Sequence, residues 1–113
     1  MKPSILTTDF TSGESIGMLL KSSPASYSFS RGLDLARLAL GAEAKVFIYL
    51  LDDAVKGVGN PEVVSLGNLG AKISVCSLAL EKFGIEVNEM IVPAGLTMMS
   101  DILLHSDRQF IFN

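Results

Sequence analysis

Cysteine is almost missing from this sequence: Cys76 is the only one in 113 residues. A single cysteine excludes an intrachain disulfide, a C-x-x-C redox site and a zinc site built from cysteines. This usage favours a reducing compartment. The first apolar residues are interrupted by Asp9 and Glu14 before the core of a signal peptide forms. We therefore expect a cytoplasmic protein.

Charged residues are also scarce, at 19%, and no cluster of lysines or arginines occurs. A net charge of -3 and a pI near 5.0 argue against nucleic acid as a partner, because binding phosphates needs a basic face. Long apolar runs are missing too. The run Val46–Leu51 is closed by Lys45 and Asp52, and is far shorter than the roughly 18 residues of a membrane span, despite a mean hydropathy of +0.44. No membrane partner is expected.

Hydrophobic residues, by contrast, make up 49% of the chain, which is enough to bury a core in one domain covering residues 1–113. Short β-branched or continuous apolar runs alternate with segments of helical periodicity. The pattern predicts strands at Ile5–Thr8, Val46–Leu51, Ile73–Val75, within 85–92 and at 109–113. It predicts helices over 28–41, after Asn60-Pro61-Glu62, over 78–83 ending at Gly84, and after a capping Thr97, with Met98, Ile102 and His105 or Leu103 and Leu104 buried.

Residues 9–27 are predicted to form a long connection, with a local helix around Ile16–Leu20 as an option. Gly13 and Gly17 raise the question of a phosphate-binding loop. Met18 and the residue after it stand where such a loop needs lysine and serine or threonine, so this motif is excluded.

Strands that alternate with helices in one domain predict an α/β fold, a three-layer α/β/α arrangement around a mostly parallel five-stranded sheet. Val46–Leu51, apolar without alternation, is expected in the centre. Parallel sheets place their sites at the carboxyl ends of the strands. Thr8 with Asp9, Asp53 with its neighbour, and Cys76 are all expected at that edge.

Cys76 is the residue on which a chemical function would depend. It is expected directly before a helix, where free main-chain N–H groups and the helix dipole favour an anion such as a thiolate. The alternative is structural, since cysteine is also a small hydrophobic residue that is commonly buried. Physical reasoning alone leaves both interpretations open.

The segment Cys76–Ile85 (CSLALEKFGI) resembles the cysteine segment of the DsrE/DsrF/TusD-like sulfur-relay family. Other segments are similar to further parts of that family, in the same order: Leu33–Leu40 (LDLARLAL), Val46–Val55 (VFIYLLDDAV), Met90–Leu96 (MIVPAGL) and Phe110–Phe112. The resemblance implies a small α/β fold and homo- or hetero-oligomers. It also implies transient carriage of sulfur as a persulfide on Cys76, with sulfur donor and acceptor proteins as partners and no cofactor.

On this basis we expect a small oligomeric sulfur carrier, or sulfurtransferase-like protein, with Cys76 as the catalytic residue. The candidates for its pocket are Thr8, Asp9, Asp53, Ser77 and Gly95. The two aspartates would shape the pocket or contact an acceptor, or would only terminate strands. The competing hypothesis is a non-catalytic oligomeric binding module whose strand-end pocket takes a small anion, a nucleotide or a partner tail.

Asp101 and His105 are four residues apart on a predicted helix, a spacing that places both on one face. Two ligands are too few for a metal ion, and the sequence has no other histidine to complete the set. We therefore expect no metal site, and interpret the pair as a surface or subunit-contact feature.

Overall fold

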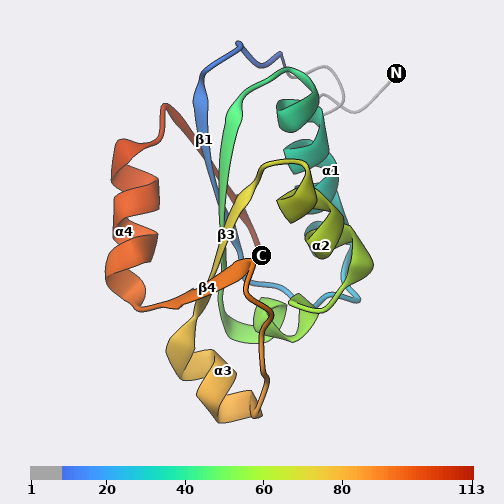
Figure 1. Ribbon diagram of the computed structural model, residues 1–113, viewed down its shortest axis with the longest axis vertical. Helices are drawn as coiled ribbons and strands as arrows, with labels where there is room; N and C mark the ends of the chain where they lie inside the picture. Colours follow the sequence, from blue (N-terminus) through green and yellow to red (C-terminus); the bar gives the residue numbers. More distant parts are fainter. Residues whose placement is uncertain (1–8) are drawn as a thin grey trace.

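The computed structural model describes residues 9–113 of the protein, and the strand predicted at Ile5–Thr8 lies outside this part. Within it, strands and helices alternate along the chain, as predicted (Figure 1). Their order is β1 (Ser15–Leu20), α1 (Tyr27–Gly41), β2 (Lys45–Leu50), the 3-10 helix η2 (Asp52–Gly57), α2 (Pro61–Asn68), β3 (Lys72–Cys76), α3 (Ser77–Phe83), β4 (Ile91–Ala94), α4 (Leu96–His105) and β5 (Arg108–Phe112).

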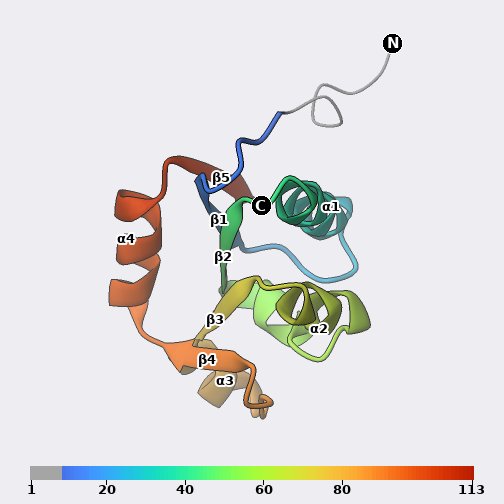
Figure 2. The ribbon, with the colours of Figure 1, turned by 45° about the horizontal axis from the view of Figure 1, so that its top comes forward.

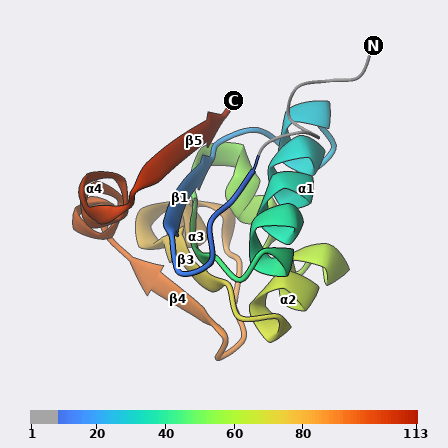
Figure 3. The ribbon, with the colours of Figure 1, turned by 90° about the horizontal axis from the view of Figure 1, so that it is seen from above.

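The five strands form one sheet in the order β4-β3-β2-β1-β5, and every neighbouring pair is parallel. The predicted fold class is therefore confirmed, and β2 is the central strand, as its continuous apolar run indicated. Helices α1 and α2 cover one face of the sheet, and α4 lies alone on the other (Figures 2 and 3). Helix α3 continues from the carboxyl end of β3.

The main core lies between the sheet and α1 and α2. Alternate residues of each strand point to this side because side chains of a strand alternate between its two faces. These are Ile16, Met18 and Leu20 of β1, Val46, Ile48 and Leu50 of β2, and Ile73 and Val75 of β3. The helices begin at true caps: the Ser26 hydroxyl accepts from Phe29 N at 3.1 Å, and Asn60 Oδ1 accepts from Glu62 N at 2.8 Å.

Helix α4 can approach β1 closely because Gly17 has no side chain. A Cβ at Gly17 would lie 2.6 Å from Ser106 Oγ and 2.9 Å from Ile102 Cγ2, distances that real Cβ atoms do not show. Gly17 is thus a packing position, with its main chain inside a strand. The smaller core on this side consists of Leu19, Tyr49 and Ile102.

The structure corrects the prediction for residues 9–27. Residues 15–20 form strand β1, so the long connection with a local helix at Ile16–Leu20 is wrong. The physical reason is that Ile16–Leu20 is a continuous apolar run, buried on both faces by the helices, in which Gly17 makes room for α4. Asp9 consequently precedes the first described strand.

The last helix also differs from its prediction. Gly95 occupies the N-cap position, and Thr97 lies inside the first turn. Ile102 is its only buried residue, whereas Leu104 is 76% exposed and Met98 and His105 are exposed as well. The expected burial is wrong at these positions because α4 packs mainly on β1 and β2, and its outer side is covered by no other described helix (Figure 3).

Strand β4 lies at one edge of the sheet and contains Pro93, which was expected to break it. An edge strand tolerates proline because one of its sides has no ladder to complete. Within residues 9–113, no helix is both long and apolar enough to cross a membrane.

Candidate functional site

Cys76 is the last residue of β3 and the N-cap position of α3. Its thiol is free, and the residue is half-buried at the carboxyl edge of the sheet, where it packs against both buried clusters. Helix α3 ends at Gly84, whose φ of 66° is in the left-handed region that glycine adopts at low cost. Cys76 is in register with Ala94 of β4, which places the turn into α4 beside it.

Tyr49 of β2 lies on the same face of the sheet as Cys76 and is completely buried. In register it is opposite Ser74 of β3. Its side chain crosses β3, and its hydroxyl donates to the carbonyl oxygens of Ala94 and Gly95, each at 3.2 Å. Tyr49 thus joins the central strand to the β4–α4 turn next to Cys76.

Burial raises the pKa of Tyr49 to about 12, and the charge of the neighbouring Cys76 thiolate and a hydrogen-bonding interaction with its side chain contribute less. A cysteine thiol ordinarily ionises near ~8.5, well below that value. The Tyr49 hydroxyl therefore keeps its proton well above the pH at which an exposed tyrosine loses it. The site combines a free thiol with a hydrogen-bond donor that stays protonated.

The structure brings Gly95 to Cys76, and it places Ser77 next in the chain, exposed in the first turn of α3. Asp53 follows β2 at the carboxyl edge, but it is exposed and its Oδ1 lies 3.4 Å from Lys56 Nζ. These three predicted pocket residues therefore share one edge of the sheet. Of the three, only Gly95 forms a hydrogen bond with Tyr49, the buried side chain beside Cys76.

Asp9 lies elsewhere. Its main-chain oxygen accepts from Arg108 Nη2 at 2.7 Å, and Arg108 begins β5, so Asp9 lies at the amino edge, opposite Cys76. Its prediction as a strand-end residue beside Cys76 is wrong, because the strand was placed before it instead of after it. Thr8, the other candidate from that prediction, is outside the described residues.

Sequence reasoning missed Tyr49. Its position inside the run Val46–Leu51 was interpreted as core, which is correct for the ring. The available signal was a hydroxyl-bearing side chain near the carboxyl end of a central strand, since a buried tyrosine needs a partner for its O–H. Its partners on β4 are 45 and 46 residues away in the chain, and local patterns do not reveal them.

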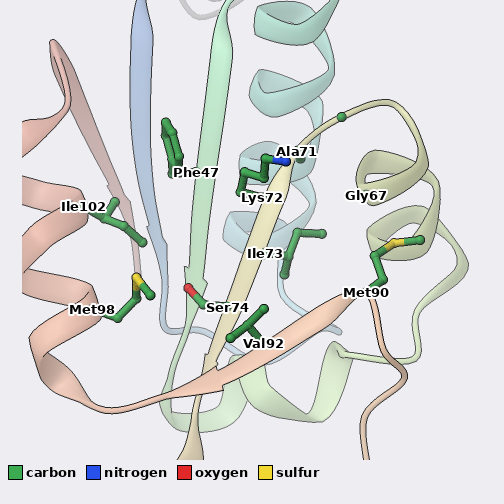
Figure 4. Close-up of a pocket in the computed structure, with 11 residues that line it drawn as sticks. Phe47, Gly67, Ala71, Lys72, Ile73, Ser74, Met90, Val92, Met98 and Ile102 are labelled. Carbon is green, nitrogen blue, oxygen red and sulfur yellow. The ribbon is translucent and has the colours of Figure 1, made fainter.

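A cavity of about 360 Å³ opens beside α4, above the part of the sheet that α4 does not cover (Figure 4). Phe47, Ser74, Val92, Met98 and Ile102 line it on this side, and Lys72 lies at its rim. Cys76 is not among the residues that line it. The cavity is largely apolar, and so fits an apolar group better than an anion.

The pair Asp101 and His105 forms a contact within α4. His105 Nδ1 lies 3.1 Å from the main-chain oxygen of Asp101, and both residues are exposed. In residues 9–113, no group of three or more potential metal-ligating side chains comes together.

No family model matches this chain, and no curated protein matches it either. Among solved structures, the chain is similar to the crystal structure of the ychN protein from E. coli, with a TM-score of 0.73. The likeness covers 88% of this chain and 99% of that one, at 16% sequence identity. Similarity at this level of identity shows a shared fold and carries no function. The chain therefore has the α/β fold of the ychN protein.

Proposed function

We propose that the protein is a small cytoplasmic sulfur carrier that holds sulfur as a persulfide on Cys76. The observation that carries the proposal is the placement of a free, half-buried thiol at the carboxyl edge of a parallel sheet, beside the buried hydroxyl of Tyr49. The resemblance of Cys76–Ile85 and four further segments to the DsrE/DsrF/TusD-like family supports the same chemistry.

In the first step, the Cys76 thiolate attacks the outer sulfur of a donor persulfide, R–S–SH. A new S–S bond forms to Cys76, the S–S bond of the donor breaks, and the donor leaves as the thiolate R–S⁻. In the second step, an acceptor thiolate attacks the outer sulfur, and Cys76 leaves as a thiolate. One cysteine is sufficient, because each step exchanges one S–S bond for another and needs no external oxidant or reductant.

Intact mass spectrometry after incubation with a small-molecule persulfide donor tests this function. The wild type is expected to gain the mass of one sulfur atom, and to lose it again when a thiol is added. Cys76→Ser is the matched control, since it keeps a small polar side chain without a sulfur nucleophile. No gain on the wild type, or an equal gain on Cys76→Ser, would overturn the proposal.

The second candidate function is a non-catalytic binding module, and the cavity beside α4 favours it. Its apolar lining by Phe47, Val92, Met98 and Ile102 is suited to a partner tail with apolar side chains. Alkylation of the native protein separates the two functions. Rapid labelling of Cys76 supports the carrier, whereas a thiol that reacts only after unfolding supports the module.

We further propose that the protein forms a homo-oligomer through α4. The exposed side of this helix carries Leu96, Met98 and Leu104, and it is flanked by exposed Val92 of β4 and Ile111 of β5. Large apolar side chains that are exposed together on one surface are normally covered by a partner, although α4 also carries the exposed polar residues Ser100, Asp101 and His105. A second copy of the chain supplies the same exposed apolar side chains, as a two-fold interface requires.

A further inference from the structure

The Tyr49 hydroxyl lies in a position where only protein groups can satisfy it. The residue is 0% exposed, its hydroxyl bonds to the carbonyl oxygens of Ala94 and Gly95, and its third neighbour, Cys76, packs against the buried cluster that contains Tyr49. Two of these neighbours are fixed acceptors on the main chain. The third, Cys76, changes from a weak acceptor to a strong one when its thiol loses the proton.

We propose that Tyr49 is a positioning residue for Cys76: its O–H donates to the Ala94 and Gly95 carbonyls while the thiol is neutral, and turns to donate to Sγ when the thiolate forms. The hydroxyl carries one proton and rotates about its C–O bond, so one acceptor can replace another. Its part in sulfur transfer rests on the proposed function, because it would stabilise Cys76 as nucleophile in the first step and as leaving group in the second.

The physical argument concerns burial and charge. A hydrogen bond to an ionised acceptor is roughly twice as strong as one between neutral groups, and exclusion of water strengthens it further. The Gly95 carbonyl keeps a second partner when it loses the shared proton, because it also accepts from Met98 N at 3.1 Å. The raised pKa of Tyr49 keeps the donor protonated while the thiol ionises.

Of the charged groups near this edge, Asp52 of η2 is exposed to solvent, whereas three others contact one another or an aromatic ring. Asp53 of η2 is paired with Lys56, whose Nζ lies 4.7 Å from the centre of the Phe83 ring. Lys82 of α3 lies 5.5 Å from the same ring. On the strands, Ser74 directs its hydroxyl to Ile48 O at 3.4 Å, and β4 carries no titratable side chain. Tyr49 is therefore the polar side chain that faces Cys76 from the strands packed beside it.

The test is the titration of Cys76 in protein labelled with 13C at the cysteine Cβ. The single cysteine gives a single resonance, and its shift follows thiol ionisation whether or not reagents reach the sulfur. Tyr49→Phe is expected to move the midpoint upward by about one pH unit, a tenfold smaller thiolate fraction below the midpoint, as expected for loss of one charge-assisted hydrogen bond. Tyr27→Phe is the matched control, because it removes the hydroxyl of the exposed tyrosine and should leave the midpoint unchanged.

A Tyr49→Phe midpoint equal to or below that of the wild type would overturn the inference. If that variant does not fold, the titration midpoint of Tyr49 is measured instead, by tyrosinate absorbance. This is done in a Tyr27→Phe background, where Tyr49 is the only tyrosine and no tryptophan interferes. Cys76→Ser should lower the Tyr49 midpoint, and an unchanged midpoint would contradict the contact. The two proposals can fail separately. If the wild type takes up sulfur but Tyr49→Phe does not move the Cys76 midpoint, only this inference is wrong. If the wild type takes up no sulfur but the midpoint moves, only the proposed function is wrong.

Discussion

Arg108 and Glu14 are 94 residues apart in the chain, yet Arg108 Nε lies 2.6 Å from Glu14 Oε2. A second guanidinium nitrogen bonds to Glu14 Oε1 at 3.0 Å and to the main-chain oxygen of Asp9 at 2.7 Å. The guanidinium also lies 4.9 Å from the centre of the Phe10 ring. Arg108 thus fastens the segment that precedes β1 to the first residue of β5, at the amino edge of the sheet.

The first prediction follows from this ion pair. The hydrogen bond from Arg108, with one from Thr11 N, lowers the pKa of Glu14 below 4.5. A carboxyl whose pKa is lower in the folded state contributes stability that is present above its unfolded pKa and is lost as the pH falls through its folded pKa. Glu14→Gln should therefore lower the free energy of unfolding at neutral pH, with the difference from wild type shrinking below pH 4.5. Chemical denaturation as a function of pH measures this, and a difference that does not depend on pH would contradict it.

Gly17→Ala is expected to destabilise the protein by about 1–3 kcal/mol, because the new methyl would overlap Ser106 and Ile102 and push α4 away from β1. Gly41→Ala is the control. Gly41 ends α1 with a helical φ, and a Cβ added there would meet no atom within 4 Å, so alanine should be neutral or slightly stabilising. Urea denaturation of the three proteins decides the matter. Equal midpoints for the two variants would refute the packing role of Gly17.

Tyr49 predicts a loss of stability in alkali. Its pKa is raised from 10.0 to about 12, so the folded state holds this proton more tightly than the unfolded chain does. The resulting stabilisation is fully present below pH 10 and disappears as the pH rises towards 12, and it amounts to about 3 kcal/mol. The difference in unfolding free energy between wild type and Tyr49→Phe should shrink over that interval. A constant difference would show that burial does not protect the hydroxyl.

Self-association through α4 predicts that Leu104→Glu gives a smaller species than the wild type in light scattering coupled to size-exclusion chromatography. The leucine is 76% exposed in the single chain, so the charge should cost little folding stability. Leu69→Glu is the matched control, since Leu69 is also exposed, at 56%, but follows α2 on the opposite side of the sheet. A wild type that is already monomeric, or equal sizes for all three proteins, would contradict the proposal.

The sequence predicted β2, α1, α2, β3 and β5 close to their observed positions, because each has a strong local signal. Asn60 and Pro61 start α2, Gly84 ends α3, and the run Val46–Leu51 has the composition of a central parallel strand. The first described strand was missed because Gly17 lowers the strand tendency of Ile16–Leu20. Gly17 is needed because Ile102 of α4 packs against it. Ile102 is 85 residues later in the chain, so a local sequence pattern does not reveal this contact.

The candidate site was predictable to the same extent. Cys76 at a strand-to-helix junction and Gly95 before the last helix follow from periodicity and topology, and the structure brings them together. Tyr49 depends on a tertiary relation, the reach of a side chain from β2 across β3 to β4. Asp9 was predicted at the carboxyl edge but lies at the amino edge. When the first strand is assigned to the wrong side of a residue, the predicted edge for that residue is reversed.

Pro93 limits how copies of this chain can join. The proline nitrogen carries no hydrogen, so β4, an outer strand of the sheet, offers one donor fewer to any strand that might align beside it. Growth of the sheet from chain to chain in the manner of a fibre is therefore disfavoured at this margin. Association is left to side chains, and the thiol at the end of the neighbouring strand stays clear of a continuous intermolecular sheet.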